Sequence, residues 1–121
     1  MGAVGKRPSA AHKENSVKIF GYVSLCEGAS LEKMMPLLKD EVTLMWQKQK
    51  EGVLREVYLR TDVPLAVVVL ECADVDEAKR VMGEFPMVRN NLIEFNFMPV
   101  TVFEPFQVLF EGFQWGEQPA S

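Results

Sequence analysis

The sequence has little histidine: His12 is its only one, and it lies in the polar stretch 1–16. A Ser-His or Cys-His nucleophile system needs a histidine inside the folded part of a protein. A histidine-ligated haem or zinc site needs one as well. We therefore expect no metal and no cofactor, and any acid–base chemistry would fall to carboxylates, tyrosine, lysine or cysteine.

Cysteine, basic charge and long apolar runs are also scarce. The two cysteines, Cys26 and Cys72, follow no metal-binding spacing, so we expect them to be reduced. The net charge of −4 leaves no basic footprint for nucleic acid. No apolar run approaches the length of a membrane span, and the N-terminal region has no apolar signal segment. These observations predict a cytoplasmic protein with no nucleic-acid or membrane partner.

What is present indicates one globular domain. The 121 residues are 48% hydrophobic and 25% charged, which is enough to form a packed core without disulfides. We expect a flexible arm over 1–16, a domain over 17–103 and an aromatic extension over 104–121. The extension carries Phe106, Leu109, Phe110, Phe113 and Trp115. The sequence leaves open whether it packs on its own domain, straps a second copy or plugs a cavity.

Period-2 alternation and capping residues place the secondary structure. Four strands are predicted, over 17–24, 53–60, 65–70 and 91–103. Two helices lie between them, one over 31–50 with Ser30 as N-cap and Gly52 as C-cap. The other begins at a capping box made by Asp74 and Glu77 and ends before Pro86. The core-facing stripe predicted for the first helix is Leu31, Met34, Leu38, Val42, Met45 and Gln49, interrupted at Pro36.

The order β-α-β-β-α-β predicts an α+β, ferredoxin-like fold, in which an antiparallel sheet carries both helices on one face. The helix-facing sets would be Val17/Ile19/Val23, Val53/Val57/Leu59 and Ile93/Phe95/Phe97. The other face would mix apolar and polar side chains. A surface of that composition usually marks an interface or a pocket, so we expect two copies to press these faces together as a dimeric α/β barrel.

The candidate site starts from one strand, in which Leu54, Glu56, Tyr58 and Arg60 alternate onto the open face. A carboxylate, a phenol and a guanidinium together could line a polar pocket, or they could form a solvated or cross-paired sheet surface. The residues expected to share this face are Phe20, Tyr22, Glu94, Asn96 and Met98.

The first helix adds another carboxylate. On a helical wheel Glu41 lies about 60° from the centre of the apolar stripe, at the buried edge, whereas Asp40 points to solvent. Glu41 could serve as a base or as a boundary ion-pair partner. Arg55 is expected on the helix side, within reach of Glu41 or Glu51, and Trp46 near the rim of the helix.

Four short segments resemble the muconolactone isomerase-like family over roughly residues 35–100. They are Leu38-Lys39-Asp40-Glu41, Lys50-Glu51-Gly52-x-x-Arg55, Phe85-Pro86-Met87 and Ile93-Glu94-Phe95. The resemblance implies a dimeric α/β barrel, assembly into a homodimer or larger homo-oligomer, and cofactor-free movement of a double bond in an unsaturated lactone. It also implies a family carboxylate at Glu41 and a family arginine at Arg55. This chain has Glu56-Val57-Tyr58 where the family enzyme has a histidine and a tryptophan, which puts the substrate in question.

Residues and resemblance together predict a small cofactor-free enzyme. It would isomerise or cyclise an unsaturated lactone or polyketide-like carbonyl compound by proton transfer. Glu41 or Glu56 would be the base, and Arg60, Tyr58 and Arg55 would stabilise the oxyanion. The predicted substrate-binding residues are Phe20, Tyr22, Trp46, Arg55, Glu94, Asn96 and Met98. Two alternatives stay open: a cofactor-free monooxygenase acting on a phenol, and a non-catalytic small-molecule-binding or assembly protein.

Overall fold

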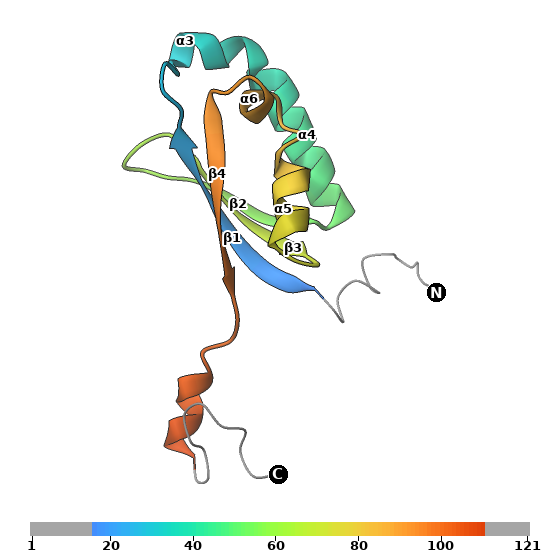
Figure 1. Ribbon diagram of the computed structural model, residues 1–121, viewed down its shortest axis with the longest axis vertical. Helices are drawn as coiled ribbons and strands as arrows, with labels where there is room; N and C mark the ends of the chain where they lie inside the picture. Colours follow the sequence, from blue (N-terminus) through green and yellow to red (C-terminus); the bar gives the residue numbers. More distant parts are fainter. Residues whose placement is uncertain (1–15, 111–121) are drawn as a thin grey trace.

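A computed structural model describes residues 16–110 of the chain (Figure 1). The sheet consists of β1 (Val17–Leu25), β2 (Leu54–Leu59), β3 (Ala66–Cys72) and β4 (Ile93–Val100). The helical segments are α3 (Leu31–Met34), η1 (Met35–Leu37), α4 (Leu38–Glu51), α5 (Val75–Met82), α6 (Pro86–Arg89) and η2 (Glu104–Leu109). Helices α4, α5 and α6 lie on one side of the sheet, while the chain after β4 runs on beyond its end.

The strand order is β2-β3-β1-β4, and every neighbouring pair is antiparallel. The connection from β1 through α4 to β2 therefore spans β3, and the connection from β3 through α5 to β4 spans β1. These two interleaved β-α-β units define the ferredoxin-like arrangement. The α+β fold class predicted from the sequence is confirmed.

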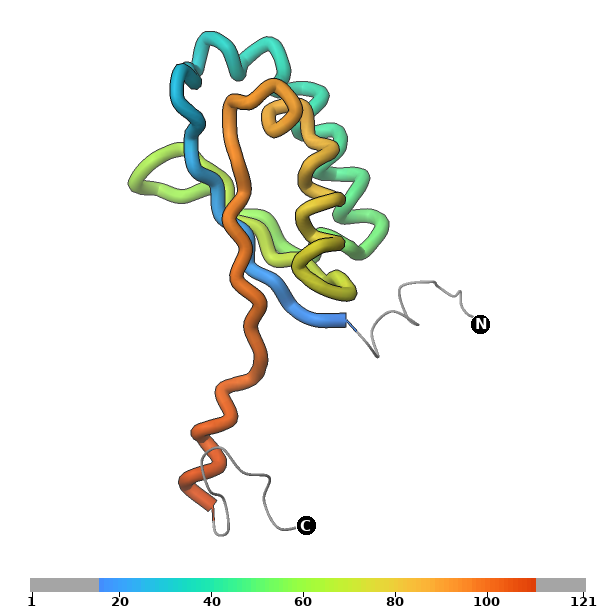
Figure 2. Tube along the Cα trace, in the orientation of Figure 1, coloured from blue at the N-terminus to red at the C-terminus, as the bar shows by residue number. Residues whose placement is uncertain are grey.

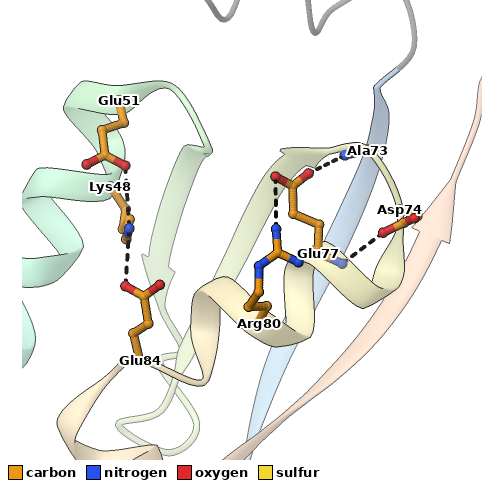
Figure 3. A network of polar contacts seen from close by, with 7 residues as sticks. All are labelled: Lys48, Glu51, Ala73, Asp74, Glu77, Arg80 and Glu84. Carbon is orange, nitrogen blue, oxygen red and sulfur yellow. Dashed lines mark hydrogen bonds and ion pairs between the residues drawn. The ribbon is translucent and has the colours of Figure 1, made fainter.

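The predicted helix starts and the end of the first helix are confirmed, whereas the second helix, predicted to run up to Pro86, ends at Met82 and Pro86 begins α6. The Ser30 hydroxyl accepts from the Lys33 N–H at 3.2 Å, and the Asp74 carboxylate accepts from the Glu77 N–H at 2.8 Å. Glu77 reaches back to the N–H of Ala73, one residue before the cap (Figure 3). Gly52 ends α4 with a φ of 89°, a conformation that glycine adopts at little cost. Pro36 lies in the 3-10 turn η1, which separates α3 from α4.

The core lies between the sheet and the helices. Its largest fully buried side chains are Ile19, Leu54, Val68, Leu70, Met82 and Phe85. Gly21 on β1 allows the closest approach in this layer, since a Cβ atom there would lie 2.9 Å from Cγ2 of Val68. That distance is shorter than van der Waals contact, so β1 has no room for a side chain at this position.

The faces predicted for the start of β2 were wrong, while Leu59 near its end lies on the predicted helix side, although it is 67% exposed. Leu54, predicted for the open face, is 1% exposed and belongs to the core. The pairing with β3 explains this: Leu54 pairs with Leu70 and Glu56 with Val69, so Arg55 is an extra residue in a β-bulge. A bulge shifts the alternation of the strand by one position, which turns Leu54 onto the helix side.

The core-facing stripe of the first helix was also predicted incorrectly. The side of α4 that faces the core carries Glu41, Leu44 and Met45, while Leu38 and Val42 are exposed. Lys48 lies on the same inner side and bridges two carboxylates, Glu51 at 3.5 Å and Glu84 at 3.3 Å (Figure 3). The second bridge joins α4 to the turn after α5.

The trace in Figure 2 shows the segment after β4 leading away from the sheet and helices. The sequence predicted strand over 91–103, but β4 ends at Val100 and a short 3-10 helix, η2, follows from Glu104. Of the residues predicted for the extension, Phe113 and Trp115 lie outside the described range. Between residues 16 and 110, no helix combines the length and apolar character needed to cross a membrane.

Candidate functional site

Six of the predicted site residues lie on the open face of the sheet, in two cross-strand rows. The register pairs Glu56 with Val69, Val69 with Phe20, and Phe20 with Met98. The next row on the same face consists of Tyr58, Val67, Tyr22 and Asn96. Strands lie about 4.8 Å apart, so the β2 and β4 ends of each row are separated by roughly 14 Å. We call these eight residues the open-face rows.

Within the open-face rows the centre is apolar apart from the Tyr22 hydroxyl, while Glu56 and Tyr58 lie at the β2 margin and Asn96 at the β4 margin. At the β2 margin the Tyr58 hydroxyl donates a hydrogen bond to the Glu56 carboxylate. This bond stabilises the protonated phenol and raises the pKa of Tyr58. At the β4 margin the Asn96 amide donates to the Ser24 hydroxyl at 2.8 Å and to the Tyr22 carbonyl at 3.3 Å. A molecule lying across this face would meet hydrocarbon in the middle and hydrogen-bonding groups at both ends.

Arg60 does not join Glu56 and Tyr58 as predicted. It follows the last residue of β2, and its guanidinium binds the Asp62 carboxylate with bonds of 2.9 and 2.6 Å. The arginine holds the pKa of Asp62 below its usual range. Its donors are therefore directed at the β2–β3 turn rather than across the sheet.

Glu41 is buried, as the helical wheel predicted, but it lies on the opposite side of the sheet from the open-face rows. Its carboxylate is 6% exposed and accepts a 2.9 Å hydrogen bond from the N–H of Met87, in the first turn of α6. Burial raises the pKa of Glu41, and the hydrogen bond from Met87 partly offsets this effect. The structure thus separates the two predicted bases, Glu41 and Glu56, by the thickness of the sheet.

Two further predicted residues also lie outside the open-face rows. Arg55 occupies the bulge and is exposed, and among residues 16–110 it forms no ion pair with Glu41 or Glu51. The predicted position of Arg55 on the helix side was wrong because the bulge changes the alternation there. Trp46 is exposed on the outer side of α4, away from the sheet.

A groove that sequence reasoning did not predict lies between α5 and β4. It has a volume of about 210 Å³, with walls formed by Met82, Gly83, Val88, Phe95 and Phe97 and charged groups supplied by Lys79 and Glu94. Glu94 pairs with Ser24 and so keeps the predicted face just beyond the open-face rows, and from the edge strand it also borders this groove. The volume is below the 300–1,000 Å³ of typical drug-sized pockets, so only a small molecule would fit. Apolar residues at helical and strand spacing look alike whether they fill a core or border a groove, which is why the sequence did not indicate it.

The hydrogen-bonding side chains of the open-face rows are one carboxylate, two phenols and one amide. Between residues 16 and 110, no three histidine, cysteine or acidic side chains come together as a metal site. The Glu56–Tyr58 pair is the one arrangement on the open-face rows that joins a proton acceptor to a donor. It can bind a polar group, or exchange a proton with one, at the β2 margin.

Comparison with known proteins gives no closer assignment. Neither a protein-family model nor a curated protein matches the sequence. Among solved structures, a NIPSNAP family protein from Agrobacterium tumefaciens strain C58 aligns with a TM-score of 0.42 and 14% identity, over 74% of this chain and 90% of that one. That likeness is too distant to carry an argument, and the fold assignment rests on the strand order described above. The predicted relation to the muconolactone isomerase-like family stays a prediction.

Proposed function

We propose that this protein is a homodimeric α/β barrel that binds a small, largely apolar organic molecule between two facing sheets. The observation that carries the proposal is the composition of the open-face rows, where Phe20, Val67 and Val69 form an apolar centre between polar margins. A sheet face with such a centre is typically covered by another layer. A second copy supplies that layer and encloses the polar groups along with it.

Proton-transfer isomerisation is the finer form of this proposal. With Glu41 and Arg60 directed elsewhere, the chemistry falls to Glu56 as base and Tyr58 as hydrogen-bond donor to the developing oxyanion. The substrate class is the one that the resemblance implies, an unsaturated lactone or a related carbonyl compound. General base catalysis contributes on the order of 10²–10⁴-fold, so Glu56→Gln should lower turnover by about a hundred-fold or more.

The test of the dimer compares two single-charge variants by sedimentation velocity. Phe20→Glu places a charge in the apolar centre and should lower the sedimentation coefficient by breaking the open-face contact. Thr43→Glu adds the same charge to an exposed position of α4, and this control should leave the dimer intact. A wild-type protein that stays monomeric at high micromolar concentration would overturn the proposal.

The ligand test uses a panel of small lactones and phenols. Thermal shift measures their binding, and ultraviolet absorbance measures their conversion. Binding should weaken in Tyr58→Phe and be unaffected in Lys79→Ala, which removes the cation from the groove between α5 and β4. The reverse result would place the small molecule in that groove and overturn its assignment to the open-face rows. Oxygen consumption with a phenol would instead favour the monooxygenase alternative.

A further inference from the structure

Helices α3 and α4 carry an apolar stripe that faces away from the core. Its members are Leu31, Met35, Leu38, Val42 and Trp46, and each is between 42% and 66% exposed. Their spacing of three and four residues places them along one side of the α3–η1–α4 segment. We call this set the outer stripe.

The outer stripe is additional to the side of α4 that packs on the sheet. Leu44 and Met45 already contact the core from the inner side, and Glu41 is bonded to α6 there. Among residues 16–110, no member of the outer stripe packs against either buried core cluster. Five large apolar side chains in one exposed row mark a contact surface for another polypeptide.

The segment after β4 carries a second exposed apolar set. Its members are Val102, Phe103, Phe106, Val108, Leu109 and Phe110, and each is between 60% and 76% exposed. The rings of Phe103 and Phe106 pack edge to face with centroids 5.0 Å apart, so part of this surface is already ordered. We call residues 102–110 the tail segment.

The tail segment cannot cover the outer stripe of its own copy. In Figures 1 and 2 the longest axis of the molecule is vertical, with η2 beyond the lower end of β4 and α3 at the upper end. A separation seen along this axis is a real separation in space. Each copy therefore presents one apolar segment and one apolar stripe that it does not bring together.

We propose that the tail segment of one copy docks on the outer stripe of a second copy. The two surfaces also carry opposite charges. Lys39 lies beside Leu38 of the outer stripe, and the tail segment contains Glu104. Among residues 16–110, neither Lys39 nor Glu104 has an ion-pair partner within its own copy. In a two-fold assembly the exchange is reciprocal, so each pair of copies makes the contact twice.

The exposed area is sufficient for a stable contact. Aromatic side chains bury about 150–250 Å² each, so the three phenylalanines of the tail segment, at roughly two-thirds exposure, offer on the order of 400 Å². The two valines and the leucine of the tail segment bring its apolar area closer to the roughly 800 Å² that each partner contributes to a standard interface. Two such contacts per pair of copies would exceed that requirement.

The test is cross-linking between two differently tagged variants in a Cys26→Ser background, which leaves only the buried Cys72. One variant carries Val42→Cys in the outer stripe, and the other carries Phe106→Cys in the tail segment. After mixing with a short bis-maleimide, the two tags should appear in one covalent product. The control replaces Val42→Cys by Asp40→Cys, which lies about 200° around the same helix. Its cross-linked yield should be lower by at least about ten-fold, because proximity sets the effective concentration of the two thiols.

Equal yields from the Val42 and Asp40 variants would overturn the proposal. Cross-linking inside a single chain that carries both Val42→Cys and Phe106→Cys would overturn it as well, since the tail segment would then cover its own stripe. The result is independent of the open-face dimer, because both cysteines lie away from the open-face rows and the Phe20→Glu variant tests that interface separately.

A second measurement uses the fluorescence of Trp46. In a Trp115→Phe background, Trp46 is the only tryptophan in the chain. Docking would remove Trp46 from water, so its emission should shift to shorter wavelength as protein concentration rises. The shift should disappear in the tail-segment variant Phe106→Ser/Leu109→Ser, and a shift that persists in that variant would contradict docking by the tail segment.

Discussion

The Glu41 carboxylate accepts a 2.9 Å hydrogen bond from the backbone N–H of Met87 and thereby links α4 to the first turn of α6. The first N–H groups of a helix have no partner within it, so a side chain from a neighbouring helix can satisfy one of them. The carboxylate that the sequence singled out as a possible base therefore has a structural role in this fold.

Glu41→Ala should lower the free energy of unfolding by about 1–3 kcal/mol, because it leaves the buried Met87 N–H without an acceptor. Urea unfolding measures this change. The matched control is Asp40→Ala, an exposed neighbour on the same helix, which should stay within about 0.5 kcal/mol of wild type. Equal losses in the two variants would contradict the role assigned to the Glu41 hydrogen bond.

The raised pKa of Glu41 makes a prediction about pH. The unfolded chain releases the Glu41 proton at the ordinary pKa of 4.5, whereas burial makes the folded protein hold it more tightly. The stabilisation of the fold by this proton is therefore fully present below pH 4.5 and is lost as pH rises through the folded pKa. Glu41→Gln keeps an acceptor for Met87 but cannot titrate. The difference in unfolding free energy, wild type minus Glu41→Gln, should therefore fall as pH rises from 4.5 toward neutrality. A difference that rises over that window would show that the hydrogen bond outweighs burial.

Burial predicts unequal effects for two leucines of β2, because the bulge at Arg55 turns Leu54 into the core while Leu59 is exposed near the strand end. Leu54→Ala removes a fully buried side chain and should cost about 2–5 kcal/mol of unfolding free energy. Leu59→Ala changes an exposed side chain and should cost less than about 0.5 kcal/mol in dilute monomer. Denaturant unfolding of the two variants measures this difference, and a loss below about 0.5 kcal/mol in Leu54→Ala would contradict the bulge that turns Leu54 inward.

Gly21 predicts a steric effect that a double-mutant cycle can isolate. In Gly21→Ala the new methyl would lie 2.9 Å from Cγ2 of Val68 and 3.3 Å from the Phe97 ring, which should destabilise the fold by about 1–3 kcal/mol. Adding Val68→Ala opens the space, so the cost of Gly21→Ala should be smaller in that background than in wild type. Strictly additive losses would show that the strain lies elsewhere.

The two thiols should differ in reactivity. Burial raises the pKa of Cys72 to about 11, so almost none of it is thiolate at neutral pH. Cys26 lies in the half-exposed loop after β1. Titration with a coloured disulfide reagent should detect one thiol per native chain and two in denaturant, and rapid labelling of Cys72 in the native protein would contradict its burial.

Much of the fold could be predicted from the sequence because its signals are local. The alternation in β1 and the apolar run of β3 gave the strands, and the caps at Ser30 and Asp74 located the helix starts. The side chain of Glu41 was correctly placed toward the interior. Members of the open-face rows, such as Phe20 and Asn96, were also assigned to one face, because their strands pair without interruption.

What the sequence alone determined is the series of strands and helices, since propensity, period and capping act over only a few neighbouring residues. The position of the bulge at Arg55 depends on how β2 pairs with β3, and that pairing joins residues distant in the chain. The same holds for α4, which has apolar residues on two sides, so only packing against the sheet and α6 decides that Leu44 turns inward and Val42 outward. Tertiary contacts therefore separated Glu41 from Glu56 and left the outer stripe exposed.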